Sequence, residues 1–151
     1  YDIQWNYYIS AVQTFSISSH LRNSSFRNSQ FVTLKAKDAI VDRIREQHQI
    51  PEELYGNILV SLTEAANTSI RHGNQSDESK HIEIEFETNP KQLTFTIKDQ
   101  GKGFDFNNVP DPTLEENIDK PFGRGIFIMK SLSDDVEFEN EGSIVRLIFN
   151  R

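Results

Sequence analysis

The sequence predicts an α+β protein, a two-layer sandwich in which helices cover one face of a mixed, mostly antiparallel sheet. Three observations predict this class. Two helical segments come first, between residues 34 and 72, strictly alternating strands follow at 81–88 and 92–99, and a further pair of strands closes the chain at 136–139 and 143–149. Because consecutive strands joined by short turns pair antiparallel, most of the sheet is expected to be antiparallel.

Length and composition indicate one domain. With 151 residues the chain can bury one substantial core but not two, so we expect a single domain over residues 1–151, with residues 1–33 as an N-terminal strand and loop extension. The net charge of −7 argues against nucleic acid as a partner, because that affinity depends largely on Lys and Arg. No apolar run reaches the roughly 20 residues of a membrane span. The start YDIQWNYY lacks the regions of a signal peptide, so we expect a cytoplasmic protein without membrane contact.

The first 50 residues contain two kinds of pattern. Aromatic and polar positions alternate in residues 1–33, which also carry the polar run RNSSFRNSQ at 22–30, so we expect one or two strands and a loop. From Leu34 to Gln49, apolar positions recur among charges in LKAKDAIVDRIREQHQ. This pattern predicts a surface helix with one buried stripe.

A second helix is predicted from Pro51 to about His72. Proline has the φ angle of a helix first turn, and Glu52 and Glu53 place negative charge near the positive end of the helix dipole. Gly73 follows as a candidate left-handed C-terminal cap, because glycine adopts positive φ without a steric penalty.

The C-terminal half combines strands with glycine-containing connections. HIEIEFET at 81–88 and QLTFTIKD at 92–99 alternate apolar and polar residues around a short turn, which predicts a β-hairpin. Residues 104–122 contain prolines and no clear period, which is typical of a functional loop. A helix over Gly125–Leu132 and a second hairpin around Glu141-Gly142 complete the expected elements.

The second helix has an unusual polar face. At a step of about 100° per residue, the side chains of Asn57, Ser61, Asn67, Thr68 and Arg71 fall on the same side as that of Glu64. An exposed helix face is usually built of Lys, Glu and Gln, whereas these residues are mostly short and have modest helix propensity. From the residues alone, two interpretations stay open: a solvated face, or one wall of a binding site.

Two glycine-containing motifs follow this helix. DQGKGFD at 99–105 places Asp99 at the end of a strand, with glycines that let the backbone turn and pass close to a ligand. KPFGRGIFIMKSL at 120–132 places two glycines before a helix whose free N–H groups suit phosphate. Each motif alone also fits ordinary turn geometry. Their order and spacing after the polar helix are more specific.

In this order the motifs resemble those of the GHKL ATP-binding superfamily, which has the Bergerat fold and includes gyrase, Hsp90, histidine kinases and MutL. Within it the chain is most similar to the small anti-sigma factor serine/threonine kinases. EAANTSIRHGN at 64–74 resembles the N box, DQGKGFD the first glycine box and GRGIFIMKSL the second. DPT at 111–113 and KPFGRG at 120–125 resemble the ATP lid, and the resemblance covers roughly Leu34 to Arg151.

The resemblance implies a role for each matching residue. Glu64 is expected to be the catalytic general base that takes the proton of an attacking serine hydroxyl. Asp99 is expected to accept the adenine amino group, and the glycine-flanked helix start to hold the phosphates. Arg71 and His72, at the end of this helix, are instead expected to have the ordinary structural role of interacting with the helix dipole. The residues expected to contact ATP are Asn67, Thr68, Asp99, Gly101, Gly103, Gly123, Arg124 and Gly125.

The chain departs from the family pattern at the metal site. The family's Mg²⁺-binding Asn lies four residues after the Glu, where this chain has Thr68, and Asn67 lies one residue early. A Thr hydroxyl is a shorter ligand than an Asn carbonyl, and Mg²⁺ tolerates misplaced ligands poorly. Three outcomes stay open: Thr68 binds Mg²⁺ directly or through water, Asn67 rotates in, or catalysis is lost while nucleotide binding persists.

The resemblance also implies partners. The leading function is phosphorylation by ATP of a serine on a STAS-type anti-anti-sigma protein, with control of a sigma factor or another partner and the homodimerisation common in the family. The alternative is a non-catalytic module that binds ATP or ADP and switches partners, with a degenerate Mg²⁺ site. A sensor histidine kinase is disfavoured, because no dimerisation helix with a phosphoacceptor His precedes the N box.

Overall fold

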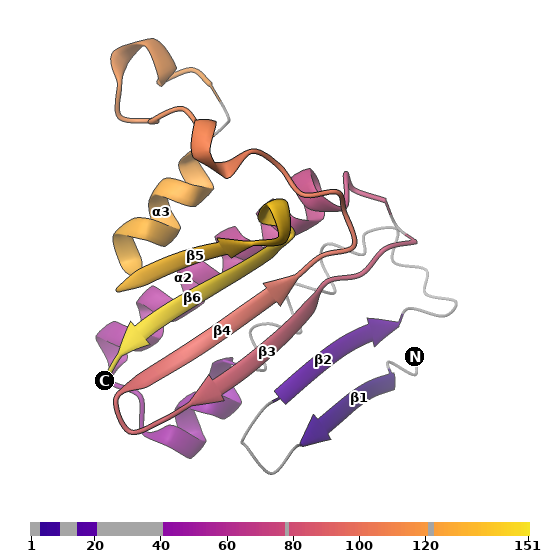
Figure 1. Ribbon diagram of the computed structural model, residues 1–151. Coiled ribbons are helices and arrows are strands. Elements are labelled where there is room, and N and C mark those ends of the chain that lie inside the picture. The colour runs from indigo at the N-terminus through magenta and orange to yellow at the C-terminus, as the bar shows by residue number, and fades with distance from the viewer. Residues whose placement is uncertain (1–3, 10–14, 21–40, 78, 121–122) are drawn as a thin grey trace.

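The computed structural model describes residues 4–9, 15–20, 41–77, 79–120 and 123–151. Figure 1 shows a sheet with the helices gathered on one of its faces. The expectations for the polar run at 22–30 and for the helix start at 34–40 fall outside the described residues. None of the helices within these ranges is both long and apolar enough to cross a membrane.

The described elements confirm the predicted α+β class. The helices are α2 (Glu52–Thr68) and α3 (Arg124–Leu132), and residues 41–48 are also helical. The sheet has the order β1-β2-β3-β4-β6-β5, and all pairings between these strands are antiparallel, so the described part of the sheet is not mixed. The strands are β1 (Gln4–Ile9), β2 (Phe15–His20), β3 (Glu83–Thr88), β4 (Gln92–Lys98), β5 (Asp135–Glu139) and β6 (Ile144–Asn150).

The N-terminal extension adds two strands to one edge of the sheet. β1 and β2 form an antiparallel pair, in agreement with the one or two strands predicted there. β2 also pairs with β3, but only over three residues, from Phe15 to Ile17. The extension and the rest of the sheet are therefore joined by hydrogen bonds at this edge.

The core lies between the sheet and α2. Strand alternation directs Phe86, Phe95 and Phe149 to the same face, where all three are fully buried. Their ring centroids are 5.0 Å apart for Phe86 and Phe95 and 6.1 Å apart for Phe95 and Phe149. From α2, Ile58 and Leu62 reach this aromatic row and are also fully buried. This packing fixes α2 on the sheet and thereby the position of its polar face.

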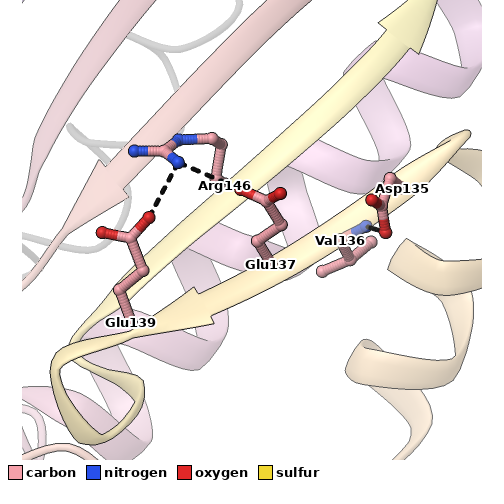
Figure 2. Close-up of polar contacts among 5 residues, drawn as sticks. All are labelled: Asp135, Val136, Glu137, Glu139 and Arg146. Atoms are coloured by element: carbon pink, nitrogen blue, oxygen red, sulfur yellow. Dashed lines mark hydrogen bonds and ion pairs between the residues drawn. The ribbon is translucent and has the colours of Figure 1, made fainter.

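Charged residues occupy the sheet face that the helices leave uncovered. Figure 2 shows Arg146 of β6 between two carboxylates of β5, with Nη1 3.0 Å from Glu137 Oε2 and 2.7 Å from Glu139 Oε1. Between the central strands β4 and β3, Lys98 Nζ lies 2.7 Å from Glu85 Oε1. Because these side chains are partly exposed, each pair is expected to stabilise the fold by no more than about 1 kcal/mol.

The end of α2 differs from the prediction. Residues Ser69–Gly73 continue α2 as a π-helical turn, and the N–H of Asn74 donates to the Ser69 carbonyl oxygen at 2.7 Å. Gly73 does not have a positive φ, and the left-handed residues are Gln75 and Ser76, so the prediction of a Gly73 cap is wrong. Gly73 is instead required for a close contact with the loop after β4, described below.

His48 is expected to make stability depend on pH. Its Nε2 is buried without a hydrogen-bond partner among the described residues, and the ring packs on Phe86 with centroids 5.6 Å apart. Burial, and secondarily the charge of Arg151, lower the pKa of His48. The unfolded chain therefore binds this proton more readily, so stability is retained above the unfolded pKa of about 6.5 and is lost as the pH falls below it.

This pH dependence can be measured by urea unfolding. Between about pH 7.5 and about pH 5.5, wild-type protein should lose more free energy of unfolding than the His48→Gln variant, which cannot bind this proton. Equal losses in the two proteins would show that His48 does not carry the effect.

Candidate functional site

A pocket of about 270 Å³ lies between the end of α2, the lid segment (residues 104–122, described to 120) and the start of α3. This volume is slightly below the roughly 300–1,000 Å³ of small-molecule sites. Six of the residues predicted from sequence come together in its wall: Glu64, Asn67, Thr68, Gly123, Arg124 and Gly125. The rest of the wall consists of Arg71, His72, Phe104, Asp105, Asn108, Val109, Pro110 and Ile126.

Gly125 is the point where α3 meets the polar face of α2. A Cβ atom at this position would lie 3.0 Å from Glu64 Oε2 and 3.3 Å from Thr68 Oγ1. Glycine therefore lets the start of α3 approach both side chains, which are one helical turn apart on α2. The contact brings a carboxylate, a hydroxyl and a helix N-terminus together in the pocket wall.

The start of α3 is suited to anions. Gly123 is its N-cap with φ of 91°, a conformation that favours glycine, and no described side chain caps the helix. The free N–H groups and the positive end of the helix dipole therefore face the pocket. Arg124 adds a positive charge there, and its guanidinium donates a hydrogen bond to the carbonyl oxygen of Ile118 in the lid segment.

The lid segment contacts the same helix start. A Cβ atom at Gly123 would lie 2.2 Å from the carbonyl oxygen of Pro110 and 3.1 Å from Cγ1 of Val109. The lid segment is therefore in contact with the start of α3 through Val109 and Pro110.

Asp99 follows β4 and lies beside the π-helical end of α2. Its Oδ1 accepts a hydrogen bond from the Gly101 N–H at 2.8 Å, whereas its Oδ2 is buried and has no partner among the described residues. Burial raises the pKa of Asp99, and the Gly101 N–H opposes this effect. The Ser69 hydroxyl also lowers this pKa, although its geometry does not make a hydrogen bond. A buried acceptor without a partner is rare and indicates a place for a ligand donor.

Two glycines pack tightly next to Asp99. A Cβ atom at Gly73 would lie 2.2 Å from Asp99 Oδ2, and one at Gly101 would lie 1.8 Å from the carbonyl oxygen of Gly73. Side chains at either position would push the loop after β4 away from α2. Asp99 and Gly101 do not line the pocket, but they pack against Gly73, which follows the lining residue His72 in the chain.

Gly103 has different neighbours from the other predicted site residues. Its φ is 76°, and a Cβ atom there would lie 1.9 Å from the carbonyl oxygen of Glu141, in the turn between β5 and β6. It lines a second cavity of about 520 Å³ with Lys102, Phe106 and Glu141, and this cavity adjoins the first pocket because Phe104 and Asp105 line both. Its expected approach to a bound base remains a prediction.

Three residues on or just after α2 differ from the prediction of one polar face that forms the site. Ser61 is fully buried and its Oγ accepts a hydrogen bond of 3.4 Å from Ser133 Oγ at the end of α3, so it belongs to the helix contact and not to the pocket. Arg71 and His72 line the pocket, whereas the sequence led us to expect only an interaction with the helix dipole. Burial, and secondarily the charge of Arg71, lower the pKa of His72.

Few side chains in the pocket could bind a metal ion. Among the described residues, no group of three or more His, Cys, Asp or Glu side chains could hold a metal ion. A cation in the pocket would therefore depend on single oxygen ligands, such as those of Thr68 and Asn67, and on oxygens of the ligand itself.

Two family models match different parts of the chain. The histidine kinase-like ATPase domain matches residues 32–149, which include the pocket and all three motifs. The THUMP domain matches residues 1–56, which include the N-terminal extension. The two matches overlap between residues 32 and 56.

Individual relatives are of two kinds. The serine-protein kinase RsbW of Oceanobacillus iheyensis is 25% identical over 95 residues, or 59% of this chain and 60% of that protein. The anti-sigma F factor of Clostridium beijerinckii is 30% identical over 87 residues, or 56% of this chain and 61% of that protein. The ribosomal RNA large subunit methyltransferase K/L of Shewanella amazonensis is 48% identical over 46 residues, or 30% of this chain and 6% of that protein. The chain therefore spans about three fifths of the kinase and anti-sigma relatives.

Proposed function

The chain belongs to the histidine kinase-like ATPase domain family, and we propose that it binds ATP in the pocket between α2, the lid segment and α3. The observation that carries the proposal is the buried Oδ2 of Asp99, which has no hydrogen-bond partner among the described residues. Such an oxygen accepts a hydrogen bond from an exocyclic amino group, which adenine carries. Gly73 and Gly101 keep side chains away from this carboxylate.

The phosphates of ATP fit the other end of the pocket. The open N-terminus of α3 and the guanidinium of Arg124 supply N–H donors and positive charge. Arg71, in the π-helical turn that follows α2, lines the same pocket and adds a second guanidinium. The donor set therefore suits an adenine at one end and a polyphosphate at the other.

Magnesium would accompany the phosphates. Thr68 lies close to Gly125, and Asn67 lines the same pocket, so these two side chains are the candidates to hold Mg²⁺ directly or through water. Thr68 is almost fully buried, which limits how far its hydroxyl can reach. Oxygen ligands of this kind suit Mg²⁺.

We assign the phosphotransfer roles to residues of the same wall. When bound, ATP would supply the transferable phosphoryl group. Glu64 takes the proton of the incoming serine hydroxyl, which requires that hydroxyl within hydrogen-bond reach of the carboxylate. Arg124, Arg71 and the helix N-terminus neutralise negative charge, and the lid segment excludes water. Positioning and charge neutralisation are the main requirements of phosphoryl transfer.

The proposed substrate is a serine of a STAS-type anti-anti-sigma protein, with a sigma factor or another protein as the controlled partner. The kinase and anti-sigma names of two relatives support this class. An ATP-dependent reaction of this kind belongs in the cytoplasm, and homodimerisation is part of the same proposal.

We propose that residues 1–151 act as one domain in which β1 and β2 extend the sheet. The pairing of β2 with β3 supports this arrangement. The methyltransferase relative shares only 6% of its own length with this chain, so we do not extend its activity to this chain.

The alternative function, a non-catalytic nucleotide-binding switch, is favoured by Thr68 at the expected metal position. Calorimetric titration with ATP, in Mg²⁺ and then in excess EDTA, separates it from a kinase. For a kinase we expect Mg²⁺ to strengthen ATP binding by at least about tenfold, equivalent to about 1.4 kcal/mol. The Thr68→Asn variant should increase this dependence, because an Asn carbonyl reaches further.

The matched control is Thr63→Asn, on the same helix but outside the pocket wall. It should leave the Mg²⁺ dependence unchanged. Wild-type binding that is indifferent to Mg²⁺, together with a large gain of phosphotransfer in Thr68→Asn, would contradict the kinase proposal and support the switch.

A further inference from the structure

We infer that Asn74 is a positioning residue for base recognition, because its side chain joins the loop that carries Asp99 to the end of α2. This inference rests on the proposed function, since it concerns how the Asp99 carboxylate is presented to adenine. Asn74 does not line the pocket and would act only through Asp99.

Both polar atoms of the Asn74 side-chain amide form hydrogen bonds. Its Nδ2 donates to the carbonyl oxygen of His81 at 3.0 Å, and its Oδ1 accepts from the backbone N–H of Gln100 at 2.8 Å. The residue is 3% exposed, so water cannot readily replace these partners. The amide therefore links the end of α2, the residues before β3 and the loop after β4.

A second hydrogen bond closes this link into a ring. The Gln100 side-chain oxygen accepts from the backbone N–H of His81 at 3.0 Å, so Gln100 is held by its own N–H and by its side chain. Gln100 lies between Asp99 and Gly101, the two residues packed against Gly73. Fixing Gln100 therefore fixes the Asp99 carboxylate on one side and the tight Gly101 contact on the other.

The π-helical turn gives Asn74 its position. The N–H of Asn74 bonds the Ser69 carbonyl oxygen, five residues earlier, instead of the four-residue spacing of an α-helix. Each residue of an α-helix turns the chain by about 100°. The π turn contains one residue more than an α-helical turn, so the side chains after it point about 100° away from their directions in a continued α-helix. The π turn thus directs Gly73 to the Asp99 carboxylate and Asn74 to the loop at the same time.

A purely structural role for Asn74 predicts a different result from a positioning role. If Asn74 only stabilised the fold, its loss would weaken the binding of every nucleotide by the same factor. If it positions Asp99, its loss should mainly weaken contacts with the base amino group. Inosine triphosphate separates the two, because it carries a carbonyl oxygen where ATP carries that amino group.

The experiment is a calorimetric titration of the full chain and its Asn74→Ala variant with ATP and with inosine triphosphate in Mg²⁺. Wild-type protein should bind ATP more tightly than inosine triphosphate. Asn74→Ala should lower the affinity for ATP by at least about tenfold, which is about 1.4 kcal/mol. The affinity for inosine triphosphate should change much less. The exposed residue Gln100 offers a second variant that should fold even if Asn74→Ala does not. Gln100→Ala should reduce the preference for ATP in the same direction by a smaller factor.

Asn117 provides the matched control. It is also a buried Asn with both amide ends bonded, to the Asp111 carbonyl oxygen at 2.8 Å and to Lys120 Nζ at 2.7 Å, but it lies in the lid segment. Asn117→Ala should therefore weaken both nucleotides alike. The inference would be overturned if Asn74→Ala and Gln100→Ala left both affinities unchanged or reduced both by the same factor. The proposed function would not be affected by that result. A wild-type protein that binds neither nucleotide would overturn the inference together with the proposed function.

Discussion

Gly101→Ala is expected to abolish measurable ATP binding and to lower the free energy of unfolding by about 3 kcal/mol, the upper part of the usual range for overpacking. The new Cβ would lie 1.8 Å from the carbonyl oxygen and 2.9 Å from the Cα of Gly73. These are backbone atoms, so no side-chain rotation can relieve the clash. The loop after β4 must instead move away from α2 and take the Asp99 carboxylate with it, which should reduce ATP affinity by at least about 100-fold.

Gly56→Ala is the matched control for this substitution. Gly56 lies inside α2, and a Cβ atom there would meet nothing within 4 Å. Alanine in a helix interior should raise the free energy of unfolding by up to about 1 kcal/mol and leave ATP affinity unchanged. Urea unfolding and calorimetry measure both quantities. Wild-type stability and affinity in Gly101→Ala would contradict the described contact between Gly101 and Gly73.

Glu64→Gln is expected to reduce phosphotransfer by about 100-fold to 10,000-fold while ATP affinity stays close to that of the wild type. Glutamine has nearly the same shape, so the packing between this side chain and Gly125 is retained. It has no carboxylate to accept the proton of the serine hydroxyl. The rate can be followed as transfer of radiolabelled γ-phosphate from ATP to a purified STAS-domain protein.

Glu53→Gln makes the same chemical change in the exposed first turn of α2, outside the pocket, and should leave the rate unchanged. A Glu64→Gln variant with the wild-type rate would exclude Glu64 as the general base. If the wild-type protein binds ATP but transfers no phosphate, the non-catalytic switch becomes the better account.

Elements with a repeating pattern could be predicted from the sequence. The alternation in β3 and β4 was sufficient to predict the hairpin and to put apolar residues such as Phe86 and Phe95 on one face, because the strand period decides which face each residue takes. The pairing of Phe86 with Phe95 comes from the structure. α3 was predicted to within one residue, since its apolar positions repeat with helical spacing.

Features that depend on contacts between distant segments could not be predicted in this way. No local pattern in the sequence indicates that Gly73, Asp99 and Gly101 pack against one another. The sequence therefore predicts a helix cap at Gly73, which the structure does not have. The burial of Ser61 likewise depends on Ser133, which is 72 residues away. Local periodicity contains no information about either contact.

The candidate site was predicted mainly through the order of three motifs. That order was sufficient to bring Glu64, Thr68 and Gly125 into one wall, where the structure also places them. The contribution of Val109 and Pro110 to the wall was not predicted residue by residue, because the lid segment has no period from which its path could be inferred.

The most direct test of the central claim is a calorimetric titration of the wild-type protein with ATP in the presence of Mg²⁺, repeated with Asp99→Asn. The account predicts saturable binding of one ATP per chain, and a loss of affinity in Asp99→Asn because an amide that presents its NH₂ group cannot accept the adenine hydrogen bond. Absence of binding by the wild-type protein, or equal affinity in Asp99→Asn, would contradict it.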